Sequence, residues 1–190
     1  MENLKDEELI SLYFQDKEEA LEILVSRYLK PVYNFIYRLT NGSAETEDLT
    51  EETFIKAWKN LRKFNRKKNF KTWLFTIAKN TVIDFFKKKK ETPFSFINSF
   101  SEDKEVYEEK IISKSLSLEE IVNQDFNQKI LEEALKKLPL NYQMVLFLRY
   151  NDHLTFQEIS EIFQKPLNTV KSWHFRALRL LKEILPQDLI

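Results

Sequence analysis

The sequence predicts an all-α fold made of two small helical domains joined by a flexible linker. Its 190 residues include one Gly and five Pro, too few for the many tight turns of a hairpin-rich β fold. Sixteen Phe and seven Tyr, in a chain that is 43% hydrophobic, exclude a disordered chain. Apolar residues recur three and four positions apart over long stretches, which is typical of amphipathic helices.

Residues 1–90 predict a bundle of four helices. A short helix from about Asp6 to Phe14 precedes a long one from Asp16 to Thr40, where Asp16 and Glu19 can form an N-terminal capping box. Pro31 is expected to kink the long helix, because it has no N–H and crowds the preceding turn. The inward stripe of this helix is predicted to hold Leu21, Leu24, Val25, Tyr28, Leu29, Val32, Phe35, Ile36 and Leu39.

Asn41-Gly42 is expected to end the long helix, since Gly42 is the only Gly of the chain and suits a left-handed cap. The third helix is predicted over about Thr46 to Phe64, with Leu49, Phe54, Ala57, Trp58 and Leu61 turned inward. The fourth is predicted over about Phe70 to Lys89, with Trp73, Leu74, Ile77, Ala78, Thr81 and Phe85 on one face.

Residues 91–124 read as the linker, because helical periodicity fades there and Ser, Asn and acidic residues dominate. Four apolar side chains are scattered through this stretch: Phe94, Phe96, Ile97 and Phe100. They suit a segment that lies in a groove of a larger partner, and they suit equally a linker that rests on its own domain.

Residues 125–190 predict a helix-turn-helix domain. Helical spacing resumes from Ile130 to Leu138, breaks at Pro139 and continues through Leu148. Thr155 to Glu158 is a capping box that opens a short helix. After a break at residues 164–167, Asn168 can cap a last helix that carries Val170, Trp173, Ala177, Leu178 and Leu181. Two short helices around a tight turn place the second one for a DNA major groove.

Charge is segregated along a chain whose net charge is zero. Residues 51–90 hold 13 basic and 3 acidic residues, a net charge of +10, between two acidic flanks. From Lys165 to Lys182 there are five basic residues and no acidic one, so the last helix is also positive. Both segments favour a polyanionic partner, and nucleic acid is the natural candidate.

Residue types argue against catalysis and against a membrane location. The chain has no Cys and only two His, His153 and His174, which excludes disulfides and thiolate metal sites. We therefore expect no enzyme activity, no metal and no cofactor. The N-terminal residues lack a basic and apolar leader, and no apolar run approaches the roughly 18 residues that span a bilayer. These features predict a cytoplasmic protein without membrane insertion.

Two groups of motifs resemble the extracytoplasmic-function (ECF) sigma factors of bacterial RNA polymerase. Residues 48–58 (DLTEETFIKAW) and 70–80 (FKTWLFTIAKN) are similar to the second region of that family. Residues 138–150, 154–162 and 169–172 are similar to its fourth region. The resemblance implies a four-helix region-two domain over residues 1–90 and a region-four helix-turn-helix domain over residues 125–190. It implies a factor that binds core RNA polymerase and directs promoter recognition, DNA melting and transcription initiation.

The resemblance also implies where each partner binds. Core polymerase is expected on the acidic face of the third helix, formed by Glu47, Asp48, Glu51 and Glu52. These carboxylates also suit a helix N-terminus, where the helix dipole favours negative charge. The minus-ten promoter element is expected at Phe64, Phe70, Lys71, Asn80, Asp84, Lys87 and Lys88. Base flipping needs an aromatic or apolar pocket with polar groups, but Phe64 and Phe70 could equally be core residues.

The minus-thirty-five element is expected at the last helix, through Thr169, Lys171, Ser172, Trp173, His174 and Arg176. Two residues depart from the family's pattern there: Trp173 stands in place of a usual Arg, and Phe175 in place of a frequent His. Gln164 and Asn168 stand where Gly is common, and a non-Gly residue at positive φ costs about 1 kcal/mol or more.

The family resemblance further implies an anti-sigma factor as a partner. The alternative function is a helix-turn-helix transcriptional regulator whose N-terminal helices sense a ligand or mediate dimerisation. Such a regulator binds duplex DNA without polymerase, usually as a dimer. The basic, aromatic stretch from Phe64 to Lys90 favours the sigma factor, because a sensor domain does not need it.

Overall fold

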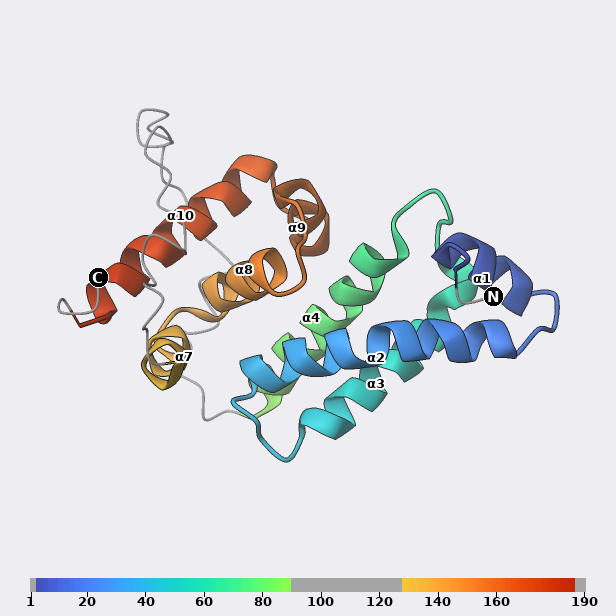
Figure 1. The fold of residues 1–190 in the computed structure, drawn as a ribbon, viewed down its shortest axis with the longest axis horizontal. Helices are drawn as coiled ribbons and strands as arrows, with labels where there is room; N and C mark the ends of the chain where they lie inside the picture. The colour runs from blue at the N-terminus through green and yellow to red at the C-terminus, as the bar shows by residue number, and fades with distance from the viewer. Residues whose placement is uncertain (1–2, 90–127, 187–190) are drawn as a thin grey trace. The chain divides into compact units, whose positions relative to one another are not determined.

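The structure, a computed structural model, describes residues 3–89 and 128–186. Every regular element in these residues is a helix, which confirms the predicted all-α fold (Figure 1). The chain divides into two compact units, one built mainly on residues 1–88 and the other mainly on residues 89–190. The predicted linker, residues 91–124, lies outside the described residues.

The first unit is a bundle of α1 (Asp6–Tyr13), α2 (Glu19–Leu39), α3 (Thr46–Asn60) and α4 (Phe70–Lys88). A single 3-10 turn, η1 (Leu61–Lys63), follows α3. Helix α2 packs against the other three helices, and α3 packs against α4 (Figure 1). The centre of the bundle is fully buried and includes Leu9, Ile10, Leu24, Val32, Phe35, Ile36, Leu74, Phe75 and Ala78.

The start of α2 differs from its prediction. Asp16 has a φ of 63° and lies in the left-handed region, so the helix begins only at Glu19 and the predicted capping box is wrong. The helix then continues through Pro31. Leu29, predicted to face inward, is 47% exposed, so the buried stripe is narrower than the apolar pattern indicates.

The end of α2 confirms the predicted left-handed cap. Asn41 and Gly42 both have positive φ, at 54° and 69°, and the Gly42 N–H donates to the Tyr37 carbonyl at 2.8 Å. Glycine is favoured at this position, because it adopts the φ of 69° without strain and carries no Cβ atom, which would lie 2.9 Å from the Tyr37 ring. The Thr40 and Thr46 hydroxyls, 2.9 Å apart, join the end of α2 to the start of α3.

The second unit contains α7 (Gln128–Lys136), α8 (Leu140–Tyr150), α9 (Phe156–Phe163) and α10 (Leu167–Ile184). Pro139 separates α7 from α8 as predicted, and the Gln143 side-chain amide donates to the Leu138 carbonyl at 2.8 Å across that break. Helices α8 and α10 pack together through buried residues that include Val145, Leu148, Val170, Trp173 and Leu178.

The capping box of α9 forms as predicted. The Thr155 N–H donates to the Glu158 carboxylate at 2.8 Å, and the Glu158 N–H donates to the Thr155 hydroxyl at 3.2 Å. The predicted cap of α10 is wrong, because Pro166 occupies the N-cap position and Asn168 lies inside the first turn. Between the two helices Gln164 has a φ of 53°, so a non-Gly residue is held at positive φ in the turn, while Asn168 is not.

Replacing Gln164 by Gly is expected to stabilise the protein by about 0.5–1 kcal/mol. Gly adopts positive φ without the clash of a Cβ atom, and this gain exceeds its larger entropy loss on folding. Urea denaturation of the full chain measures the change. Lys165→Gly, at the next exposed position, whose φ is not positive, is the matched control and should lower stability. A destabilised Gln164→Gly variant would contradict strain in this turn.

Candidate nucleic-acid interface

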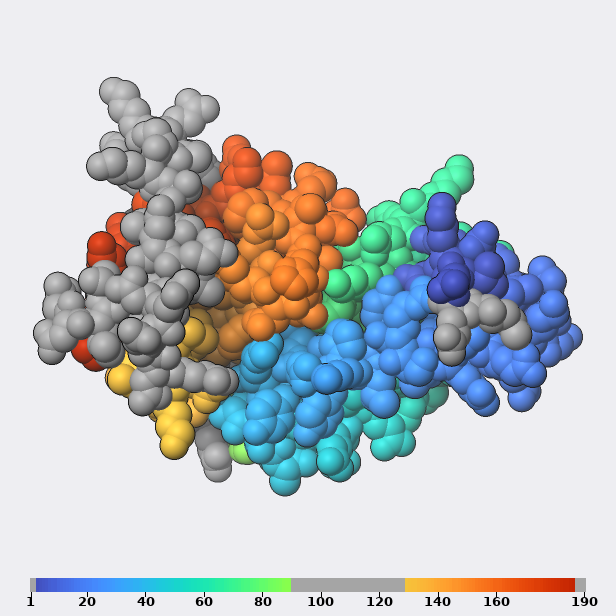
Figure 2. All heavy atoms as spheres, in the orientation of Figure 1, coloured from blue at the N-terminus to red at the C-terminus, as the bar shows by residue number. Residues whose placement is uncertain are grey.

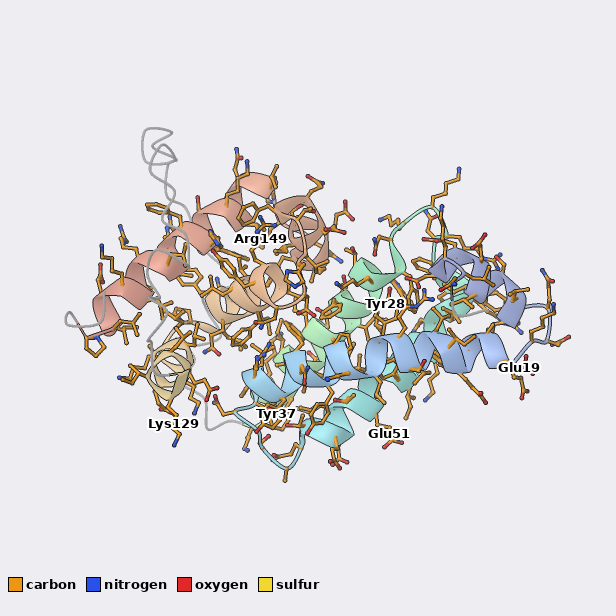
Figure 3. All side chains as sticks on the ribbon, viewed as in Figure 1. Glu19, Tyr28, Tyr37, Glu51, Lys129 and Arg149 are labelled. Atoms are coloured by element: carbon orange, nitrogen blue, oxygen red, sulfur yellow. The ribbon has the colours of Figure 1, made fainter. Side chains whose placement is uncertain are left out.

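Helix α3 presents the acidic face, defined as Glu47, Asp48, Glu51 and Glu52. The first three side chains are exposed, and Figure 3 shows Glu51 on the outer side of the helix. Glu52 is half-buried and pairs with Lys56, whose Nζ lies 2.8 Å from its carboxylate. Leu49, Thr53 and Ala57 are buried on the opposite side and hold the helix in the bundle.

Apolar side chains border the acidic face. Phe54 and Trp58, predicted to be inward, are only half-buried, with their rings edge to face at 6.2 Å. Ile55 is 44% exposed. Sequence reasoning did not predict that Ile55 is exposed. Its position four residues after Glu51 was the available signal, because residues four apart share one face of a helix, and that face is not the inward one. The surface around the acidic face therefore combines charge with exposed apolar area, and a protein interface likewise has an apolar core and a polar rim.

An aromatic cluster joins the end of η1 to the start of α4. The Phe70 ring lies 5.6 Å from both Phe64 and Trp73, and Phe64 lies 5.1 Å from Trp73. Phe64 and Phe70 are buried, at 6% and 1% exposure, so these two rings are core residues in this structure rather than open stacking surfaces. Trp73 is half-buried and is the ring of the three that reaches the surface most.

The loop of residues 65–69, the 65–69 loop, leads into α4 and carries three exposed cations, Arg66, Lys67 and Lys68. Asn65 orders its start by accepting the Lys67 N–H at 3.0 Å. Asn69 acts as the N-cap of α4, since its side-chain oxygen accepts the Thr72 N–H at 3.0 Å. The loop is thus short, positively charged and anchored to the helix that follows.

The predicted minus-ten residues of α4 separate into two groups. Lys71 is half-buried, with its ammonium 5.9 Å from the centre of the Phe75 ring. Asn80, Asp84, Lys87 and Lys88 are all exposed. Their spacing of three and four places them on one face of the helix, and we call this set the α4 ridge. A ridge of polar side chains that ends in two lysines suits a phosphate backbone.

Helix α10 turns its predicted reading residues in different directions. Lys171 is exposed, while Thr169, Ser172 and Arg176 are half-buried. Trp173 is 2% exposed and packs in the core of the second unit, which does not support the predicted DNA contact. The reason is helical spacing, because residue 173 shares the inward face with Val170 and Ala177.

His174 takes part in packing within the second unit. Its ring stacks on Tyr150, and its Nε2 atom is hydrogen-bonded to the Tyr150 hydroxyl at 3.0 Å. Phe156 contacts the same ring edge to face at 5.0 Å, and the Arg149 guanidinium lies 5.0 Å above Phe156. Burial, and then the charge of Arg149, lower the pKa of His174 to about 4. At neutral pH this imidazole is uncharged and joins α8, α9 and α10, which does not support the predicted DNA contact.

The low pKa of His174 predicts a loss of stability in mild acid. Between pH 6.5 and 4 the unfolded chain binds a proton that the folded chain does not, so unfolding becomes easier as pH falls through this window. The expected loss between pH 7 and pH 5 is about 2 kcal/mol. His174→Gln should remove this part of the pH dependence in urea denaturation. An unchanged pH dependence in that variant would contradict a buried neutral imidazole.

Two further findings concern metal sites and membrane-spanning helices. Within the described ranges, no group of three or more His, Cys, Asp or Glu residues could hold a metal ion. Across the same ranges no helix combines the length and apolar character that crossing a bilayer requires.

Both units match known sequence families. The sigma-70 region 2 family matches residues 24–92, and the sigma-70 region 4 family matches residues 128–181. The ECF RNA polymerase sigma factor SigW of Bacillus subtilis is 32% identical over 171 residues, which cover 88% of this chain and 90% of SigW. The chain belongs to the ECF sigma factor family. Sigma-H of Pseudomonas aeruginosa is 28% identical, over 95% of this chain and 94% of the relative.

Solved structures share the fold of this sigma factor. CnrH, solved in complex with the cytosolic domain of CnrY, aligns with a TM-score of 0.67 at 17% identity, over 94% of this chain and 96% of that one. RpoE of Bartonella quintana, solved with the anti-sigma factor NepR, aligns with a TM-score of 0.61 at 22% identity, over 86% and 95%. The all-helical architecture described above is therefore an established one.

Proposed function

We propose that this sigma factor binds core RNA polymerase and directs it to promoters, where it takes part in DNA melting and transcription initiation. The observation that carries the proposal is the pair of folded units, which match sigma regions 2 and 4 in chain order and each expose a cationic helix surface. The cationic surfaces are the α4 ridge with the 65–69 loop in one unit and Lys171 on α10 in the other. Their charge favours phosphate contacts.

Each surface has a proposed partner. The acidic face of α3, with Ile55 at its border, docks on core polymerase. The 65–69 loop, Lys71 and the α4 ridge contact the minus-ten element, and Trp73 is the most exposed ring of the neighbouring aromatic cluster. Thr169, Lys171, Ser172 and Arg176 read the minus-thirty-five element from α10. Holding both units on one polymerase raises the effective concentration of each at its own element.

The proposal includes no chemistry by the chain itself. Binding energy drives recognition and melting, so the factor is not an enzyme and needs no cofactor. Residues 1–90 form the region-two domain, residues 91–124 the linker and residues 125–190 the region-four domain. The proposed location is the cytoplasm, where core polymerase and promoter DNA are present.

An anti-sigma factor is proposed as a further partner. RpoE of Bartonella quintana was solved in complex with the anti-sigma factor NepR, and this chain shares its fold. A partner that covers the acidic face or the cationic surfaces would keep the factor from polymerase and from DNA.

A mobility-shift experiment with and without core polymerase tests the proposed function. The expected result is a specific shift of promoter fragments only when polymerase and this chain are both present. A specific shift of duplex DNA by the chain alone, with no binding to polymerase, would overturn the proposal in favour of a helix-turn-helix regulator.

A further inference from the structure

The Arg66 side chain joins helix α1 to the 65–69 loop. Its guanidinium donates to the Ser11 hydroxyl at 3.2 Å and lies 5.0 Å above the Phe14 ring. Ser11 in turn donates to the Glu7 carbonyl at 2.7 Å, so the acceptor is itself held by α1. Figure 1 shows the loop beside α1, and Figure 2 shows green atoms of this region next to the dark-blue atoms of α1.

A second bridge connects α1 to the end of the same loop through α2. The Tyr28 hydroxyl donates to the Asp6 carboxylate, and the Tyr28 ring lies edge-on to Phe70 at 5.5 Å. Arg27 pairs with the same carboxylate and also donates to the Leu4 carbonyl at 3.0 Å. Burial, and then the hydrogen bond to Asp6, raise the pKa of Tyr28 far above its usual range, so its hydroxyl stays a donor.

Both bridges hold the same short segment, the 65–69 loop and the residues next to it. Phe64 directly precedes the loop and Phe70 directly follows it, and their rings are in contact at 5.6 Å. Phe70 is the residue that Tyr28 supports, and Arg66 lies in the middle of the loop. The five loop residues are all exposed. Contacts to α1 therefore supplement the Asn65 and Asn69 hydrogen bonds that order the loop from within.

We propose that α1 is a positioning element for the 65–69 loop, and that Arg66, held by Ser11 and Phe14, sets the base preference of this factor at the minus-ten element. This inference rests on the proposed function, because it assumes that the loop meets DNA. Base readout requires groups that are held in place by their own supports, and a loop freed from α1 would present its polar groups in many arrangements. In this role Arg66 holds the loop in one conformation and does not itself contact a base.

The test measures selectivity and not only affinity. Polymerase holoenzyme is assembled with each variant and titrated with four single-stranded minus-ten oligonucleotides that differ at one base. Arg66→Ala is expected to reduce the ratio of best to worst affinity by about threefold to tenfold. Phe14→Leu, which keeps apolar bulk but removes the ring under the guanidinium, should lower the same ratio.

Lys68→Ala is the matched control, because it removes one positive charge from the same loop. No contact from its side chain to α1 is found among the described residues. It is expected to weaken binding of all four oligonucleotides about equally and to leave the ratio unchanged, as loss of a phosphate contact does. A change of ratio in Lys68→Ala as large as in Arg66→Ala would contradict a special role for the α1 contacts.

A double-variant cycle separates positioning from direct contact. If Arg66 acts through Phe14, adding Arg66→Ala to Phe14→Leu should change the ratio far less than Arg66→Ala does alone. Fully additive effects, or an unchanged ratio in Arg66→Ala, would overturn the inference.

Tyr28→Phe supplies a second, milder variant, since it keeps the ring against Phe70 and removes only the bond to Asp6. It should lower the ratio about twofold to threefold while circular dichroism stays unchanged. An unchanged ratio in this variant would overturn the part of the inference that runs through Tyr28. If the wild-type holoenzyme itself prefers no base, the proposed function fails instead, so the two failures are distinguishable.

Discussion

Asp48→Arg combined with Glu52→Arg is expected to weaken binding of core polymerase by at least 100-fold. Both positions lie on the acidic face of α3, and reversing them places two cations where the proposed interface needs two anions. Removing one partner of a close charge pair at an interface costs about 2–5 kcal/mol, and reversal adds repulsion. Titration of labelled polymerase, with co-purification as a second readout, measures the loss.

The matched control is Glu19→Arg combined with Glu22→Arg. These two exposed carboxylates lie in the first turn of α2, so their reversal changes the net charge by the same amount at another helix N-terminus. Figure 3 shows Glu19 at the start of α2, away from Glu51 on α3. Circular dichroism should show both double variants folded, although Glu52→Arg also loses the Lys56 ion pair, worth roughly 0.3–0.5 kcal/mol. Retained polymerase binding in the α3 variant would refute this docking face.

Lys171→Ala combined with Arg176→Ala is expected to lower affinity for the minus-thirty-five element about 10-fold to 100-fold and to leave polymerase binding intact. Both residues lie within positions 167–176 of α10, the part of the helix that is proposed to enter a major groove. Each base contact of this kind contributes about 1–3 kcal/mol of discrimination. Holoenzyme binding to duplexes with and without the upstream element isolates the effect.

Lys182→Ala removes a cation from the last turn of the same helix and serves as the control. It should change affinity for the upstream element by less than about threefold, because it lies in the last turn of α10, beyond both test residues. Unchanged promoter affinity in the Lys171 and Arg176 double variant would contradict the proposed reading surface. A loss equal in the control would point to general charge attraction instead of recognition.

Periodicity predicted the helices well, while several of their ends depended on tertiary structure. The Thr155 to Glu158 capping box formed because both of its partners are local. Asp16 offered the same kind of signal, yet the chain takes a positive φ there and α2 starts three residues later. Several polar residues near a helix start can act as caps, and the packing of neighbouring helices decides between them.

Among the site residues, too, some positions could be predicted from local sequence and others depended on the fold. The exposed charges of α3, α4 and α10 followed from their spacing, since charged side chains are rarely buried. Aromatic residues and His174 were ambiguous, because the same ring suits a core or a binding surface. For Trp173, the helical spacing that it shares with other inward residues already indicated a buried side chain. The Arg66 and Tyr28 bridges could not be predicted, because they join residues far apart in sequence that only the fold brings together.

Run-off transcription with purified bacterial core polymerase, on a library of promoters from the genome that encodes this chain, tests the central claim most directly. The account predicts specific transcripts only when this chain is added, with start sites that align on two shared upstream elements. Polymerase that gains no initiation from the chain, while the chain alone shifts duplex DNA specifically, would contradict it.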